Sequence, residues 1–161
     1  MQKITPFLWF DNQAEEAMNF YVSIFKNSKV LGMQRYGRES AQASGQPEGS
    51  VMTASFQLEG QEFVALNGGP VFRISPAISF VVSCETQAEI DDYWQKLTAG
   101  GEEVQCGWLT DKFGVSWQIV PVALEKLLSD PDPAISGRVM QAMLQMKKID
   151  IAGLLHARTV A

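Results

Sequence analysis

The sequence has little of the residues on which covalent and metal chemistry most often rests. Its 161 residues include two cysteines, Cys84 and Cys106, and a single histidine, His156. A disulfide framework needs more cysteine, and a Cys/His zinc site would need nearly all three residues brought together from distant segments. No cationic neighbour lowers the pKa of either thiol, so we expect ordinary buried cysteines. His156 has no partner at helical spacing and is expected to be a surface residue.

Charge and long apolar runs are also scarce. The formal net charge is -5, only 19% of the residues are charged, and the 13 Lys and Arg residues are spread along the chain. Nucleic acid is therefore not an expected partner. No run reaches the roughly 18 apolar residues of a membrane span, and the N-terminus has no apolar signal core. We expect a cytoplasmic protein without a membrane partner, and the 46% hydrophobic content predicts a folded globular chain.

The first part of the chain has the pattern of a strand, a helix and three further strands. Asn12 with Glu15 is typical of a capping box that begins the helix, and the polar stretch from Gly37 to Gly49 is the best candidate for a mobile loop. The expected elements are a strand over Ile4–Phe10, a helix to Phe25, and strands over Val30–Tyr36, Val51–Leu58 and Glu62–Leu66.

The same order then occurs a second time. Thr86 with Glu89 is typical of a second capping box, 74 residues after the first. The expected elements are a strand over Ala77–Cys84, a helix to Leu97, and strands over Val104–Leu109 and Val115–Pro121. Agreement of order and spacing predicts an internal duplication. The predicted fold class is α+β, with one domain at 1–122 made of two modules of a strand, a helix and further antiparallel strands, about 1–70 and 71–122.

The last part of the chain, 123–161, is predicted to be a helical extension. Ala123–Leu128 can form a short helix, which Pro131 and Pro133 end. Apolar residues from Ile135 to Leu144 then recur at helical spacing. This methionine-rich face is expected to pack on its own domain or on a sister subunit.

Several segments together resemble one family. TPFLWFD, AEEAMNFY, ISFVVSCETQAEIDDYW, TDKFGVSWQIVP and VMQAMLQMKKIDIAGL are similar to the PhnB-like family of the glyoxalase/bleomycin-resistance/dioxygenase (vicinal oxygen chelate) superfamily. The resemblance implies two βαβββ modules whose sheets curve around a central cavity, usually in a homodimer. Many members carry the label 3-demethylubiquinone-9 3-methyltransferase.

The resemblance also implies where a metal would bind. Superfamily enzymes use His, Glu or Gln from the first and last strand of each module, and the corresponding residues here are Thr5, Ala65 or Asn67, Ala77 and Gln118. A divalent cation needs imidazole, thiolate or several anionic oxygens. We therefore expect no metal ion and no cofactor.

A methyltransferase would need a binding turn for its methyl donor. S-adenosylmethionine commonly binds a Gly-rich turn after the first strand of a doubly wound sheet. Here Asp11-Asn12-Gln13 follows the first strand, and Gly68-Gly69-Pro70 is typical of a connector between modules. The pattern disfavours that activity.

The strand pattern predicts a ligand cavity. Phe7 and Trp9 would face inward, and the convergent polar groups would be Asn67, Ser79 and Gln118. Trp9 can equally be core, and the three polar side chains can equally satisfy backbone groups. Asp111 is expected to be a turn residue that bonds its own backbone.

The predicted function is metal-independent binding of a small hydrophobic or aromatic molecule whose identity the sequence does not give. The alternative is an enzyme, either of the metal-dependent glyoxalase/dioxygenase type or a 3-demethylubiquinone 3-methyltransferase. In a third interpretation the cavity is vestigial and the dimer surface carries the function.

Overall fold

The chain divides into two compact units, each with a four-stranded sheet. A computed structural model describes residues 1–160, and the units are Met1–Ile74 and a second that begins at Ser75. The first unit contains, in chain order, β1 (Phe7–Phe10), α1 (Ala14–Ile24), β2 (Ser28–Arg35), α2 (Arg38–Ser44), β3 (Val51–Leu58) and β4 (Gln61–Asn67). The second contains β5 (Ser79–Cys84), α3 (Gln87–Thr98), β6 (Glu102–Glu103), β7 (Trp108–Thr110), β8 (Ser116–Pro121), α4 (Ala123–Leu128), α5 (Pro133–Leu144) and α6 (Ile151–Thr159).

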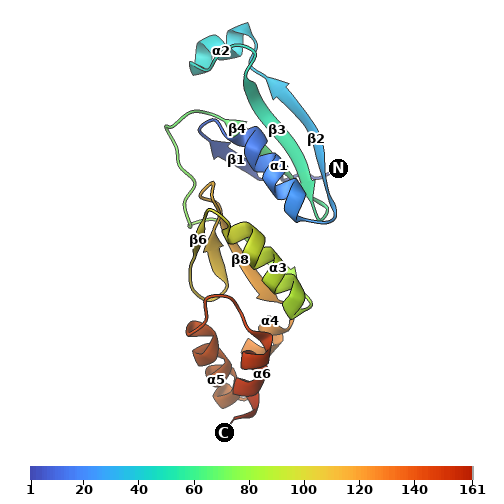
Figure 1. Ribbon diagram of the computed structural model, residues 1–161, viewed down its shortest axis with the longest axis vertical. Coiled ribbons are helices and arrows are strands. Elements are labelled where there is room, and N and C mark those ends of the chain that lie inside the picture. Colours follow the sequence, from blue (N-terminus) through green and yellow to red (C-terminus); the bar gives the residue numbers. More distant parts are fainter. Residues whose placement is uncertain (161) are drawn as a thin grey trace. The chain divides into compact units, whose positions relative to one another are not determined.

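Both sheets have the same topology. Their strand orders are β1-β4-β3-β2 and β5-β8-β7-β6. The first and last strands of each module pair in parallel, and the remaining pairs are antiparallel. Figure 1 shows α1 lying along the strands of the first unit and α3 along those of the second. The predicted α+β class with tandem βαβββ modules and a C-terminal helical extension is confirmed.

One face of the first sheet is buried by α1. The side chains of Ala54, Phe56 and Leu58 alternate along β3 on this face and are at most 4% exposed. Tyr21 of α1 stacks on Phe56 with ring centroids 6.0 Å apart. Burial of such side chains stabilises a fold by roughly 1.5–3 kcal/mol each. Side chains repeat their direction every two residues in β3 and every 3.6 residues in α1, and this spacing of the apolar residues determines which face of the sheet the helix covers.

The first helix does not begin as predicted. Its N-cap is Gln13, which makes no side-chain bond, and Asn12 does not act as a cap. The Ala14 amide donates instead to Oδ1 of Asn67 at 2.8 Å. The prediction of an Asn12 cap was wrong because a side chain 53 residues away, at the end of β4, supplies the acceptor.

The cap of the second helix is confirmed. Thr86 Oγ1 accepts from the Glu89 amide at 3.2 Å. The Glu89 carboxylate in turn accepts from the Glu85 amide at 3.0 Å. The first bond satisfies an amide that the helix start leaves without an intrahelical acceptor, and the second holds the residue before the N-cap.

Two further expectations need correction. The segment Gly37–Gly49 contains the exposed helix α2, which ends at Gly45 with φ of 74°. The expected strand Val104–Leu109 is mostly a turn, because Cys106 and Gly107 have φ of 58° and 82°. Left-handed residues cannot continue a strand, so β7 begins only at Trp108, after the turn that separates it from β6.

The outer strand of the first sheet is irregular. β2 pairs with β3, and its register shifts between Val30 and Gly32, which leaves Leu31 in a bulge. Val30 and Leu31 are 46% and 43% exposed. The helix α1 therefore covers the centre of the sheet and leaves β2 largely uncovered.

The helical extension forms a small core of its own. Its buried residues are Leu124, Leu127, Val139, Ile149 and Leu154. The last helix, α6, was not foreseen from the sequence. Arg138 of α5 binds it by donating to the backbone oxygens of Ala157 and Arg158, both at 3.1 Å.

A strap at 146–151 joins the extension to the second module. The amides of Cys106 and Gly107 donate to the backbone oxygens of Met146 and Lys147, both at 2.8 Å. A Cβ at Gly107 would lie 3.0 Å from the Ile149 side chain and 2.9 Å from a backbone oxygen. The close approach of the strap therefore requires glycine.

The start of α3 holds the other side of the strap. Gln87 donates to the Ile149 oxygen at 3.0 Å and accepts from the Ile151 amide at 2.8 Å. Lys148 pairs with Asp91 at 2.7 Å. The hydrogen bonds of the Asp91 carboxylate with Lys148 and Gln87 lower its pKa. Hydrogen bonds and one ion pair thus join the extension to the second module.

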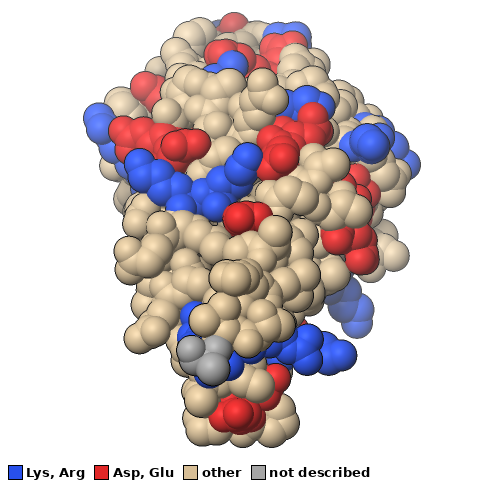
Figure 2. All heavy atoms as spheres, turned by 60° about the horizontal axis from the view of Figure 1, so that its bottom comes forward, with Lys and Arg blue, Asp and Glu red and all other residues tan. Residues whose placement is uncertain are grey.

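The helices of the described residues and the charges on the face seen in Figure 2 differ from those of membrane spans and of surfaces with a single charge sign. Over residues 1–160, no helix combines the length and the apolarity that crossing a bilayer requires. On the face drawn in Figure 2, Lys and Arg side chains lie beside Asp and Glu side chains, and neither sign covers a large continuous area.

Replacing Gln87 with alanine should loosen the strap. We expect Gln87→Ala to lower the free energy of unfolding by about 1–3 kcal/mol, because two backbone groups of the strap lose their partner. The measurement is urea unfolding, with limited proteolysis between α5 and α6. Gln95→Ala on the exposed side of the same helix is the control. Equal stability of the two variants would contradict the role given to Gln87.

Candidate functional site

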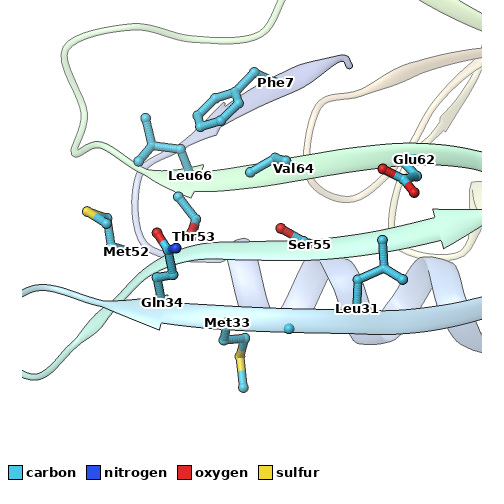
Figure 3. A pocket seen from close by; sticks show the side chains of 11 residues that line it. Phe7, Leu31, Met33, Gln34, Met52, Thr53, Ser55, Glu62, Val64 and Leu66 are labelled. Carbon is cyan, nitrogen blue, oxygen red and sulfur yellow. The ribbon is translucent and has the colours of Figure 1, made fainter. Parts of the chain in front are cut away.

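The face of the first sheet opposite α1 is an open trough of about 830 Å³. Its floor is made of alternate residues of β3 and β4, and β1 and β2 form its sides. Figure 3 shows Leu66, Val64 and Glu62 in line along β4, with Phe7 above them. The eleven lining residues are Phe7, Leu31, Gly32, Met33, Gln34, Met52, Thr53, Ser55, Glu62, Val64 and Leu66.

Phe7 and Trp9, both predicted to face a cavity, lie on this open face. Phe7 lines the trough and is 58% exposed. Trp9 is half-buried beside Leu66, its partner in the β1–β4 register. The indole Nε1 donates to the Gly69 oxygen at 2.8 Å. A Cβ at Gly68 would lie 2.3 Å from the indole ring, so only glycine allows the connector to cover it.

Asn67 lies on the opposite face, with only 7% of its surface exposed. Besides accepting from Ala14, its side chain donates to the Val51 oxygen at 3.1 Å. Its backbone oxygen accepts from the Tyr36 hydroxyl. Asn67 therefore satisfies backbone groups, which is one of the two roles that the sequence left open, and it does not line the trough.

Ser79 and Gln118 form a pair in the second unit. The Gln118 amide donates to Ser79 Oγ at 2.9 Å. Gln118 pairs with Val81 and Trp117 with Phe80, so Gln118 and Ser79 lie on the face opposite the buried Trp117. The structure thus brings together two of the five predicted residues on the open face of the second sheet.

The open-face residues of β4 were missed because the sequence placed this strand one residue out of register. The parallel pairing sets Leu8 opposite Ala65 and Phe7 opposite Val64. Ala65 is fully buried on the helix side, so the inward positions are Val64 and Leu66. The alternation of β3 with β4 could have found them, since the turn Glu59–Gly60 fixes that register.

The donors on the two open faces do not fit a divalent cation. Thr5, Ser79 and Gln118 supply neutral oxygens, and Thr5 already accepts from Gln2 at 3.2 Å. Within residues 1–160, no three His, Cys, Asp or Glu side chains are grouped as metal ligands. A methyl donor fits no better, because β1 leads into α1 through 11–13 without any glycine.

Two groups with reactive side chains serve the core instead. Asp111 is buried, its Oδ1 accepts from the amides of Phe113 and Val115, and its Oδ2 accepts from Trp117 Nε1 at 2.8 Å. The prediction of a turn residue is confirmed. Burial, with the Glu89 charge as a smaller cause, raises the pKa of the Cys84 thiol to about 11. Cys84 is therefore no nucleophile at neutral pH.

Removal of the Asn67 amide should destabilise the first unit. We expect Asn67→Ala to cost about 1–3 kcal/mol, because the Ala14 amide and the Val51 oxygen are left buried without partners. Asn67→Asp keeps the acceptor and should recover part of the loss. Chemical unfolding measures both, and Asn27→Ala, an exposed asparagine, is the control. A loss as small as that of the control would show that Asn67 is dispensable.

Because burial raises the pKa of the Cys84 thiol, the free energy of unfolding should decrease at alkaline pH. The folded protein keeps the thiol proton up to about pH 11, whereas the unfolded chain releases it near 9.0, the ordinary pKa of the thiol. The contribution of Cys84 to the free energy of unfolding should therefore be fully present below pH 9 and decrease between pH 9 and 11. Urea unfolding of the native protein and of Cys84→Ala across this range measures the difference. A parallel decline in both proteins would exclude Cys84 as the cause.

The comparisons with known proteins agree on one family. The family model described as 3-demethylubiquinone-9 3-methyltransferase matches residues 2–120. A PhnB protein from Bacillus cereus, given the provisional name 3-demethylubiquinone-9 3-methyltransferase, is 41% identical, with a TM-score of 0.66 over 75% of this chain and 100% of its own. A search of the curated proteins found no match.

More distant structures show the fold alone. Protein PA1353 from Pseudomonas aeruginosa is 21% identical, with a TM-score of 0.60 over 75% of this chain and 98% of its own. The fosfomycin resistance protein FosX from Listeria monocytogenes is 15% identical, with a TM-score of 0.55 over 78% of this chain and 94% of its own. Taken with the tandem βαβββ modules, these matches establish that the chain belongs to the PhnB-like family described as 3-demethylubiquinone-9 3-methyltransferase, within the glyoxalase/bleomycin-resistance fold.

Proposed function

We propose that this protein binds a small, largely apolar organic molecule in the trough of its first sheet, without a metal ion. The observation that carries the proposal is the trough itself: an open sheet face with exposed apolar side chains. A site with apolar walls and a few polar groups is typical of small-molecule binding. Phe7, Val64 and Leu66 supply the apolar surface, and Thr53 and Ser55 supply hydroxyl groups.

Metal independence is supported by the chemistry of the donors. The open face of the first sheet offers hydroxyl groups and a single carboxylate, that of Glu62, where a divalent cation would need imidazole or several anionic oxygens. The pair Ser79–Gln118 satisfies its own hydrogen bond and gives the second sheet a polar patch. We propose this pair as a hydrogen-bonding element of the second unit in its own right, and Phe7 and Trp9 as the aromatic element of the first unit.

The family description favours a methyltransferase as the second candidate. It rests on the match over residues 2–120 and on the name of the Bacillus cereus relative. Calorimetric titration with S-adenosylmethionine tests it directly. Saturable binding with one site per chain would favour the enzyme, and we expect none because no glycine-rich turn follows β1.

We also propose a cytoplasmic homodimer. Two free cysteines suit a reducing compartment. Met140 and Leu144 on α5 are 38% and 50% exposed and give this helix an apolar surface that a second copy could cover. The molecular mass from light scattering tests the dimer.

Shortening Phe7 should weaken binding. We expect Phe7→Ser to reduce the affinity for N-phenyl-1-naphthylamine, a neutral fluorescent probe, about tenfold, because an exposed aromatic wall is lost. Val71→Ser removes an exposed apolar side chain (75%) that does not line the trough, and should leave the affinity unchanged. Fluorescence titration gives the dissociation constants. No saturable binding by the native protein, or an equal effect of both variants, would refute the proposal.

A further inference from the structure

One charged side chain lies among the trough residues. Glu62 is half-buried on β4, two residues from Val64 and four from Leu66, at one end of the row seen in Figure 3. The other ten lining residues are uncharged. A ligand that fills the trough therefore meets a single fixed charge, and that charge is negative.

The backbone of Glu62 is held while its carboxylate stays free to bind. Its amide donates to Gln2 Oε1 at 3.1 Å, and its backbone oxygen accepts from Gln2 Nε2 at 3.0 Å. Within residues 1–160, the carboxylate forms neither a hydrogen bond nor an ion pair. Gln2 thus fixes the place of Glu62 at the end of the trough without neutralising its charge.

Within residues 1–160, no lysine or arginine forms an ion pair with the Glu62 carboxylate. Lys29 occupies the same row of the sheet, since it pairs with Gln57, which in turn pairs with Glu62. Neighbouring strands are about 4.8 Å apart, so the two backbones are separated by roughly 10 Å. The Glu62 charge is accordingly left for a ligand, which would strengthen the interaction by excluding water.

Resting on the proposed function, we infer that the trough selects an organic cation: a protonated amine on an apolar or aromatic body. The body packs on Phe7 and Val64, which are paired in the register of β1 and β4. Glu62 lies two residues from Val64, so the ammonium group sits about 7 Å from the centre of the apolar contact. Organic anions are disfavoured, because no lysine or arginine lines the trough.

Three probes of matched shape test this selectivity. They are 1-naphthylmethylamine, 1-naphthylmethanol and 1-naphthoate, which are a cation, a neutral molecule and an anion at pH 7. We expect the native protein to bind the amine about 3- to 10-fold more tightly than the alcohol, as for a partly exposed ion pair, and the anion most weakly. The preference should shrink at 1 M NaCl. Titrations followed by NMR of the protein amides give the affinities and the residues touched.

Variants of Glu62 test whether its carboxylate causes the preference for the amine. Glu62→Gln should abolish the preference for the amine and leave the affinity for the alcohol unchanged, and Glu62→Lys should favour 1-naphthoate. Glu48→Gln removes an exposed carboxylate of the same unit outside the trough and should change nothing. Circular dichroism establishes that each variant is folded.

The outcomes separate this inference from the function on which it rests. Equal binding of all three probes at the trough would overturn the selectivity for cations and leave the binding function standing. The absence of any saturable binding would overturn both. A preference for the amine that survives in Glu62→Gln would overturn the role of Glu62.

Discussion

The buried side-chain amide of Asn67 joins more of the first unit than any single apolar contact described here. Its oxygen holds the start of α1, its nitrogen holds the start of β3, and its backbone oxygen receives the hydroxyl of Tyr36, just beyond β2. The next amide, at Gly68, donates to Phe10 of β1. Asn67, at the end of β4, is thus bonded to the start of α1, to the start of β3 and to the residue after β2, and its neighbour Gly68 is bonded to β1. These bonds orient α1 on one face of the sheet and leave the other face free.

Because α1 covers only one face of the first sheet, a ligand can reach only the other face. On the helix side, Phe56 and Phe63 stack at 5.5 Å and close the core. On the other side the same strands present Ser55 and Val64, which no element of the first unit covers. The second unit uses a carboxylate for a comparable task, since Asp111 ties the turn between β7 and β8 to Trp117. The hydrogen bonds of Asn67 and of Asp111 thus give each module a fixed local geometry.

The sequence predicted the repeated modules because alternation and helical spacing are local properties. Predictions from the sequence were wrong or incomplete where a local feature depends on a contact with a distant residue. Asn12 has the form of an N-cap, yet Asn67 acts from 53 residues away. The face of Val64 depends on pairing with Phe7, and the unforeseen α6 depends on Arg138 and on the strap. Phe7 and Trp9 could be predicted as site residues because they are aromatic residues of a predicted strand. The place of Glu62 in the trough became visible only from the register of β4 in the structure.

The bulge at Leu31 has a consequence for the behaviour of the protein in concentrated solution. An outer strand beside an uncovered apolar face is a template on which strands of other molecules can add, and sheet extension of this kind leads to aggregates. In β2 the regular ladder is interrupted near its middle, and Lys29 and Arg35 bring positive charge to its two ends. The irregularity that places Leu31 over the trough therefore also hinders growth of the sheet, so that the face can stay open without promoting aggregation.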